Sequence, residues 1–129
     1  MLEKHQIQDY NNNGFIVIED LLSKNEIRQT CDIINQFIEK SRDIKESDNI
    51  FDLEDDHSRN NPRLTRVKQP HLINDHFFNL IKNSQITEAL KDLLGNNILL
   101  KSSKLNTKFE KGGSAVEWHQ DWAFYPHTN

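Results

Sequence analysis

The sequence has few of the features that mark secreted, membrane-spanning or nucleic-acid-binding proteins. It contains a single cysteine, Cys31, so no internal disulfide can form. No apolar run approaches the roughly 20 residues needed to cross a bilayer, and the first residues lack an apolar signal core. The net charge of −4 provides no basic surface for a polyanion. We therefore expect a cytoplasmic protein that has neither a membrane nor a nucleic acid as its partner.

The composition is polar but compatible with a folded domain. The chain has 129 residues, and domains commonly contain about 100–200. Hydrophobic residues make up 35% of the chain and charged residues 28%. Much of the polar excess lies between residues 40 and 61. We predict a long surface loop there, of the kind that often binds ligands, and interpret the acidic residues 52–56 as solvated.

The first part of the chain predicts a strand followed by an amphipathic helix. Residues 14–18 are apolar and β-branched after a run of asparagines, which is typical of a strand. Ser23 and Glu26 have the spacing of a capping box. Apolar residues then recur at helical intervals to about residue 41. Cys31 falls on this apolar face, so we predict a buried, unreactive thiol.

The second part predicts helices and then strands. Asn74 or Asp75 can cap a short helical turn, and a clearer helix that begins at Ser84 ends at Gly95. Strand-like segments follow over residues 97–101, 104–109 and 115–121. The predicted order is therefore a strand, then helices, then β-structure at the C-terminal end.

His119 and Asp121 are the residues with the clearest chemical potential. On an extended strand, residues two apart point to the same face, so an imidazole nitrogen and a carboxylate oxygen can meet at one metal ion. With a distant histidine, such a pair forms the facial triad of non-heme Fe(II) oxygenases. On spacing alone, a surface histidine beside a solvated aspartate is the simpler interpretation, because the pair is common by chance.

Three parts of the sequence, residues 15–23, 102–108 and 117–129, resemble the phytanoyl-CoA dioxygenase family. That family opens with a strand and a capped helix, and its iron motif is commonly His-Gln-Asp followed by aromatic residues, as at 119–125 here. The resemblance follows the chain in order and is strongest over 102–129. It implies an Fe(II)/2-oxoglutarate-dependent dioxygenase that hydroxylates an unactivated C–H bond of a small organic or acyl substrate.

The resemblance also implies a fold of the α+β or mainly β class. This fold is a partial double-stranded β-helix, a cupin-like jelly roll with the N-terminal helices packed outside. Residues 1–129 would form the N-terminal part of one oxygenase domain. The helical region would extend to about residue 95, and the first jelly-roll strands would occupy about 96–129.

The same resemblance suggests roles for individual residues. His119 and Asp121 match the first two iron ligands of the family. Asn106, 13 positions before His119, matches a position that hydrogen-bonds 2-oxoglutarate. Arg66 resembles a position where some members direct a basic residue toward the cosubstrate, although it can equally pair with the acidic loop. Gln120 belongs to the motif and can also face the cosubstrate, but an ideal strand would turn it away from the metal.

Lys104 and Tyr125 resemble positions that line the pocket nearer the substrate. In the family, the third iron ligand is a downstream histidine, and a following arginine clamps the far carboxylate of 2-oxoglutarate. This chain has neither. His127 lies too close to Asp121 and follows Pro126, but a local site that uses it with His119 and Asp121 remains an alternative.

Three hypotheses follow from these departures. The chain is an incomplete part of an oxygenase, inactive alone and prone to self-association through exposed strand edges. Alternatively, it is a non-catalytic binding or partner-associating module that keeps the N-terminal scaffold of the oxygenase. In the third hypothesis, a second chain or a second copy supplies the missing histidine and arginine.

Overall fold

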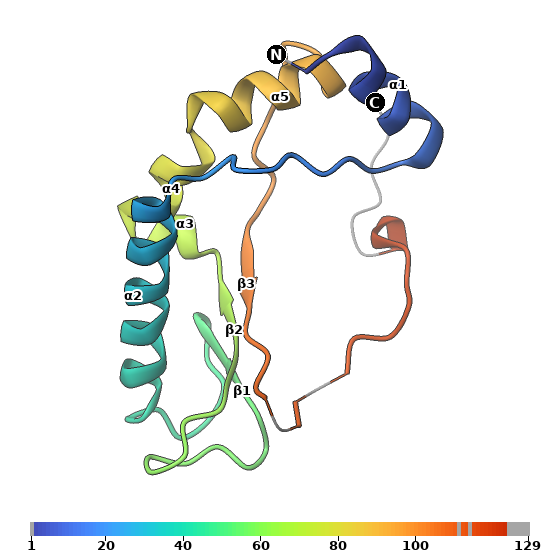
Figure 1. The fold of residues 1–129 in the computed structure, drawn as a ribbon. Coiled ribbons are helices and arrows are strands. Elements are labelled where there is room, and N and C mark those ends of the chain that lie inside the picture. Colours follow the sequence, from blue (N-terminus) through green and yellow to red (C-terminus); the bar gives the residue numbers. More distant parts are fainter. Residues whose placement is uncertain (1, 111, 114, 124–129) are drawn as a thin grey trace.

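The computed structural model describes residues 2–110, 112–113 and 115–123. Figure 1 shows that these residues form helices arranged around a small sheet. The elements are α1 (Lys4–Asn13), α2 (Lys24–Ser41), β1 (Phe51–Leu53), β2 (Leu64–Lys68), α3 (Pro70–Ile73), α4 (Asp75–Ile81), α5 (Ser84–Leu94), β3 (Lys104–Asn106) and the 3₁₀ turn η1 (Asp121–Ala123). The predicted combination of helices and β-structure is thus present.

Helix α2 begins where the sequence predicts. Ser23 Oγ accepts a hydrogen bond from the Glu26 amide at 3.2 Å, and the Glu26 carboxylate accepts one from the Ser23 amide at 2.8 Å. These two bonds form the predicted capping box. The buried face of the helix carries Ile33 and Phe37. Cys31 lies outside that face and is exposed, so the prediction of a buried thiol is wrong.

The strands form one antiparallel sheet in the order β1-β2-β3. Val67 of β2 lies opposite Phe51 of β1 and Leu105 of β3, so these side chains share one face. The pairing of β1 with β2 then shifts by one residue, which leaves Thr65 as the extra residue of a β-bulge. The bulge returns Leu64 to the face of Val67, and both side chains are fully buried.

Helices α2 and α4 cover this apolar face of the sheet (Figure 1). Phe37 of α2 packs edge-on against Phe51 and in a stacked arrangement against Phe77 of α4, with 6.0 Å between the ring centroids in each pair. Such aromatic pairs add about 0.5–1.5 kcal/mol to the stabilisation from burial alone. The core therefore uses one face of the sheet and leaves the other for polar side chains.

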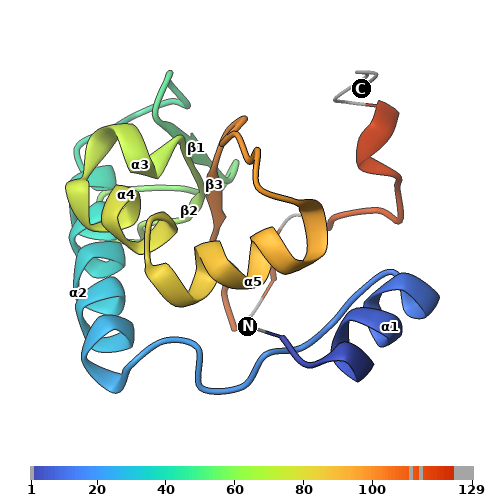
Figure 2. The same cartoon turned by 90° about the horizontal axis from the view of Figure 1, so that it is seen from above.

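Several predicted strands are extended or irregular segments without a strand partner. Residues 14–18 run beside α5 (Figure 2) but pair with no described strand. Residues 97–101 form no strand, and only Lys104–Asn106 of the predicted segment 104–109 pairs, as β3. The described part of 115–121 is irregular before η1. The strand predictions at 14–18, 97–101 and 115–121 are therefore wrong for the described residues, because an extended backbone needs a neighbouring strand to form a ladder.

Other elements were missed. The predicted loop contains β1 and an isolated bridge between Ser58 and Asn61. β2 and α1 were not predicted either. β1 spans three residues and β2 five, which is too short for a periodic signal in the sequence.

The described residues also leave a large apolar surface uncovered. Phe15 is 67% exposed, Val17 72% and Leu99 88%. Ile16 and Ile18, on either side of Val17, line a cavity against α5 together with Phe15. No described helix is both long and apolar enough to cross a membrane.

Truncation of Phe37 to alanine tests whether the aromatic cluster holds the sheet to the helices. Phe37→Ala is expected to lower the free energy of unfolding by about 3–5 kcal/mol, the range for a buried phenylalanine. Urea unfolding monitored by circular dichroism measures the change. Leu72→Ala, at a side chain that is 71% exposed, is the control and should change stability by at most about 0.5 kcal/mol. Equal effects of the two substitutions would contradict the proposed core.

Candidate metal and anion site

A row of polar side chains crosses the face of the sheet opposite the core. Asp52 of β1 is in register with Arg66 of β2, which is in register with Asn106 of β3. The Arg66 guanidinium donates from Nε to Asn106 Oδ1 at 3.2 Å and from Nη1 to Asp52 Oδ2 at 3.4 Å. The sheet therefore holds the guanidinium between an amide on one side and a carboxylate on the other.

The neighbouring row brings two lysines together. Lys68 of β2 is in register with Lys104 of β3. The Lys68 ammonium lies 2.6 Å from Asp52 Oδ1 and donates to the Asp48 carbonyl at 2.8 Å. Lys104 is exposed and forms no ion pair with a described residue. This face therefore carries three cations, Arg66, Lys68 and Lys104. Among the described residues, Asp52 is the one carboxylate that pairs with any of them.

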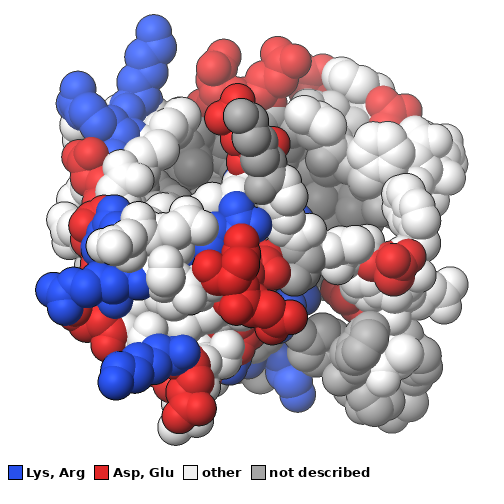
Figure 3. All heavy atoms as spheres, turned by 90° about the horizontal axis from the view of Figure 1, so that it is seen from below, with Lys and Arg blue, Asp and Glu red and all other residues white. Residues whose placement is uncertain are grey.

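A cavity of about 530 Å³ opens beside this face. One wall comes from the sheet and contains Arg66, Lys104 and Asn106; the other comes from the segment before and into η1 and contains His119 and Asp121. The remaining lining residues are Ala115, Val116 and Glu117. Figure 3 shows acidic and basic side chains intermixed on the face of the molecule seen from below, without an extended patch of one sign.

His119 and Asp121 face each other across a short irregular stretch of backbone. His119 Nε2 lies 3.1 Å from Asp121 Oδ1, and His119 Nδ1 lies 2.7 Å from the Glu117 carbonyl oxygen. A hydrogen bond from Nδ1 to this carbonyl leaves Nε2 as the nitrogen available to a metal ion. The expected strand is absent here, but the two side chains still converge, because the backbone turns into η1 at Asp121.

The donor set of this pair suits a divalent transition metal. One imidazole nitrogen and one carboxylate oxygen are the ligand types of non-heme iron sites. No group of three or more His, Cys, Asp or Glu side chains within the described residues is arranged to hold a metal ion. Among the described residues, two side chains of suitable chemistry therefore converge here.

The structure brings five of the predicted site residues to one cavity. Sheet residues Arg66, Lys104 and Asn106 meet His119 and Asp121 across it. Among the other predictions, Gln120 is exposed and is not among the residues that line the cavity. Tyr125, His127 and Pro126 lie outside the described residues.

Sequence analysis missed one residue of this arrangement, Asp52. It was grouped with the solvated acidic residues of a loop, but it lies on β1 and contacts two cations. The alternative that Arg66 pairs with the acidic loop is confirmed, but β1 and β2 are too short to give a periodic signal that would single out Asp52.

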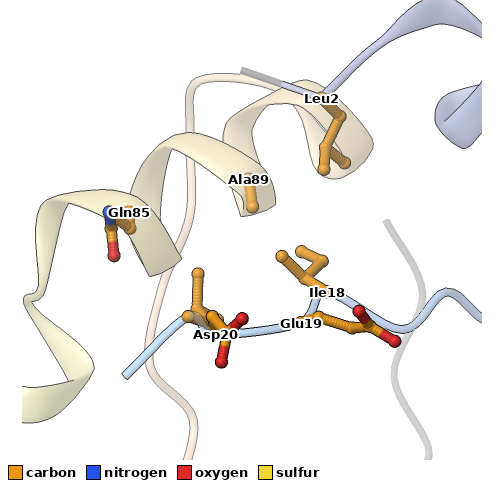
Figure 4. Close-up of a pocket in the computed structure, with 7 residues that line it drawn as sticks. Leu2, Ile18, Glu19, Asp20, Gln85 and Ala89 are labelled. Carbon is orange, nitrogen blue, oxygen red and sulfur yellow. The ribbon is translucent and has the colours of Figure 1, made fainter. Parts of the chain in front are cut away.

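A second cavity, of about 180 Å³, lies between the N-terminal residues, the extended segment after α1, and α5 (Figure 4). Ile18 and Ala89 form its apolar part, and Glu19, Asp20 and Gln85 contribute polar groups. None of the described residues that line it is a histidine or a cysteine. The cavity at β2 and β3 is therefore the better candidate for a metal-dependent reaction.

The sequence matches the family model of phytanoyl-CoA dioxygenase (PhyH) over residues 10–129. The chain belongs to the phytanoyl-CoA dioxygenase family, as the resemblance predicted. It is 34% identical over 124 residues to a probable alpha-ketoglutarate-dependent hypophosphite dioxygenase of Stutzerimonas stutzeri, covering 96% of this chain and 43% of that protein.

More distant relatives are ectoine dioxygenases. Identity is 21% over 116 residues to the enzyme of Streptomyces anulatus and 20% over 121 residues to that of Bordetella bronchiseptica. These matches cover 90% and 94% of this chain and 37% of each relative. The chain thus spans less than half the length of the curated relatives that it matches.

Asp48 offers a pH-dependent test of how β1 is held beside the site. The backbone N–H groups of Phe51 and then Ile50 hold the pKa of its carboxyl below the ordinary value of 3.8. Because the folded pKa is lowered, the carboxylate stabilises the fold above about pH 3.8, and this contribution is lost as the pH falls through the folded pKa.

Asp48→Asn should therefore reduce the free energy of unfolding at neutral pH, and its difference from the wild type should shrink below pH 3.8. Urea unfolding across a pH series measures both effects. Asp55→Asn, in the same acidic stretch, controls for the loss of one negative charge. If the difference in unfolding free energy between wild type and Asp48→Asn does not vary with pH, folding does not lower the pKa of the Asp48 carboxyl, and the prediction is wrong.

Proposed function

We propose that this chain contributes the first two iron ligands and part of the cosubstrate site of an Fe(II)/2-oxoglutarate-dependent dioxygenase. The observation that carries the proposal is the single cavity in which His119 and Asp121 face Arg66, Lys104 and Asn106. Membership in the phytanoyl-CoA dioxygenase family and the similarity to an alpha-ketoglutarate-dependent dioxygenase support it.

His119 Nε2 and the Asp121 carboxylate would hold the iron. Their separation of 3.1 Å is short enough for both groups to contact one metal ion. Bound iron with 2-oxoglutarate supplies oxygen activation and the transfer of an oxygen atom to the substrate. The third protein ligand is proposed to come from residues outside the described part of the chain.

The sheet side of the cavity would bind the cosubstrate. 2-Oxoglutarate carries two carboxylates, and Arg66 can donate charge-assisted hydrogen bonds to one of them. Asn106, which accepts from Arg66 Nε, keeps its amide N–H groups for a second acceptor. Gln120 is proposed as a further cosubstrate contact, although it does not line the described cavity.

Lys104 and Tyr125 are proposed to contact the substrate, a small organic or acyl molecule hydroxylated at a C–H bond. A second candidate is a small oxyanion such as hypophosphite, oxidised at a P–H bond. Two observations favour it: the 34% identity to a probable hypophosphite dioxygenase and the Lys104 ammonium, which is not paired with any described carboxylate. In either case, the lysine would orient a polar or anionic part of the substrate.

The proposed fold is the jelly roll of the family, in which the described sheet is one part and the helices pack outside. The exposed apolar side chains of Phe15, Val17 and Leu99 would then be covered by further strands or by a second copy of the chain. A non-catalytic module with the same scaffold is the alternative function, and it predicts no metal-dependent turnover.

The test uses the protein at its natural length under anaerobic conditions. Fe(II) and 2-oxoglutarate together should produce the visible charge-transfer absorption of an iron–2-oxoacid chelate, and admission of oxygen with substrate should release succinate. His119→Ala and Asp121→Ala should each weaken metal binding by about tenfold or more, because each removes a ligand.

His5→Ala is the matched control, since His5 is 69% exposed and far from the cavity in the sequence; it should bind iron as the wild type does. Arg66→Met should weaken 2-oxoglutarate binding without changing metal affinity. A protein that binds neither iron nor 2-oxoglutarate would contradict the oxygenase proposal and favour the binding module.

A further inference from the structure

We propose that Asp52 is a positioning residue of the anion site, which acts by holding the side chains of two neighbouring cations, Arg66 and Lys68. The inference rests on the proposed function insofar as the anion is 2-oxoglutarate. Asp52 is not among the residues that line the cavity. Its influence would therefore pass through the side chains that it contacts.

The contacts of Asp52 divide its two oxygens between the two cations. Oδ1 takes the Lys68 ammonium at 2.6 Å, and Oδ2 takes Arg66 Nη1 at 3.4 Å. Its side chain is 26% exposed, so these interactions are only partly screened by solvent. Asp56, which pairs with Arg63 at 3.2 Å in the same acidic stretch, is 64% exposed. The structure thus distinguishes Asp52 from Asp56.

The effect on Lys68 follows from the register of the sheet. Lys68 and Lys104 lie opposite each other on β2 and β3, and like charges in this arrangement repel. Asp52, together with the Asp48 carbonyl, holds the Lys68 ammonium on the β1 side of β2. Of the two lysines, Lys104 therefore lines the cavity and Lys68 does not.

The effect on Arg66 is orientational. With Nη1 on Asp52 and Nε on Asn106, the plane of the guanidinium is fixed at two points. Its Nη2 group has no hydrogen-bond partner among the described residues and remains available to an anion. An arginine fixed in this way loses less conformational entropy when it binds a carboxylate. Asp52 thus positions both cations on the sheet wall of the cavity: it contacts Arg66 directly, and it acts on Lys104 by holding Lys68 away.

The sign of one substitution separates positioning from simple charge. Asp52→Asn removes a negative charge near the cavity, so electrostatic attraction alone would make the protein bind an anion more tightly. Loss of positioning would make it bind more weakly. We expect the dissociation constant for 2-oxoglutarate, measured by calorimetry with Mn(II) in place of iron, to rise roughly threefold to tenfold.

Asp52→Glu should restore part of the affinity, because it keeps the carboxylate. Asp56→Asn, which breaks a comparable ion pair with Arg63, is the control and should bind 2-oxoglutarate as the wild type does. In the Arg66→Met background, Asp52→Asn should weaken binding less than it does in the wild type, because the part of its effect that passes through Arg66 is already lost. Unchanged or tighter binding by Asp52→Asn, or additive losses in the double variant, would overturn the proposal.

A readout without ligand separates this inference from the proposed function. Hydrogen exchange of the Arg66 Nε–H, followed by NMR, should be accelerated in Asp52→Asn and unchanged in Asp56→Asn. A wild-type protein that binds no 2-oxoglutarate would contradict the proposed function, and the exchange rates would still decide whether Asp52 orders Arg66. Equal exchange rates in wild type and Asp52→Asn would overturn the positioning role.

Discussion

The two-sided character of β2 is the constraint on which the rest of the structure depends. Leu64 and Val67 face the aromatic core beneath α2, whereas Arg66 lies on the opposite face with its partners on β1 and β3. Because side chains alternate along a strand, a register slip of one residue would direct Arg66 toward the core. Burial of an unpaired charge costs several kcal/mol. Core packing and site geometry are therefore specified by the same register.

The bulge at Thr65 reconciles these two demands. Strict alternation would place Leu64 on the same face as Arg66, because they are two residues apart. The extra residue allows Leu64 to join Val67 in the core without displacing Arg66. The bulge thus adds one apolar side chain to the core and leaves the polar row intact, which fits the frequent use of bulges beside functional sites.

Local signals predicted what is local in this structure. The capping box at Ser23 and the end of α5 at Gly95 depend on a few consecutive residues, and both predictions are confirmed. The predicted residues Arg66, Asn106 and His119 also line one cavity, but their roles remain predictions. That grouping came from the family resemblance, since no spacing in the sequence relates Arg66 to His119.

The features that the sequence could not predict depend on pairing between distant segments. β1 has three residues, and its partner is separated from it by a polar loop, so neither strand gives a periodic pattern. The sequence therefore predicts a solvated Asp52, and only the pairing of β1 with β2 shows that it lies opposite Arg66. Conversely, residues 14–18 have the composition of a strand, but no described segment supplies the hydrogen bonds of a ladder.

The two walls of the candidate site are held very differently. The sheet wall is fixed by backbone ladders and by the ion pairs of Asp52. The wall that contains His119 and Asp121 is irregular; Trp118 is fully exposed and Val116 is 60% exposed, so little apolar packing holds it. A ligand that bridges the walls would therefore stabilise the second more than the first. The sheet is therefore the preorganised half of the candidate site, and binding of metal and anion as proposed would order the His119–Asp121 segment more than the sheet.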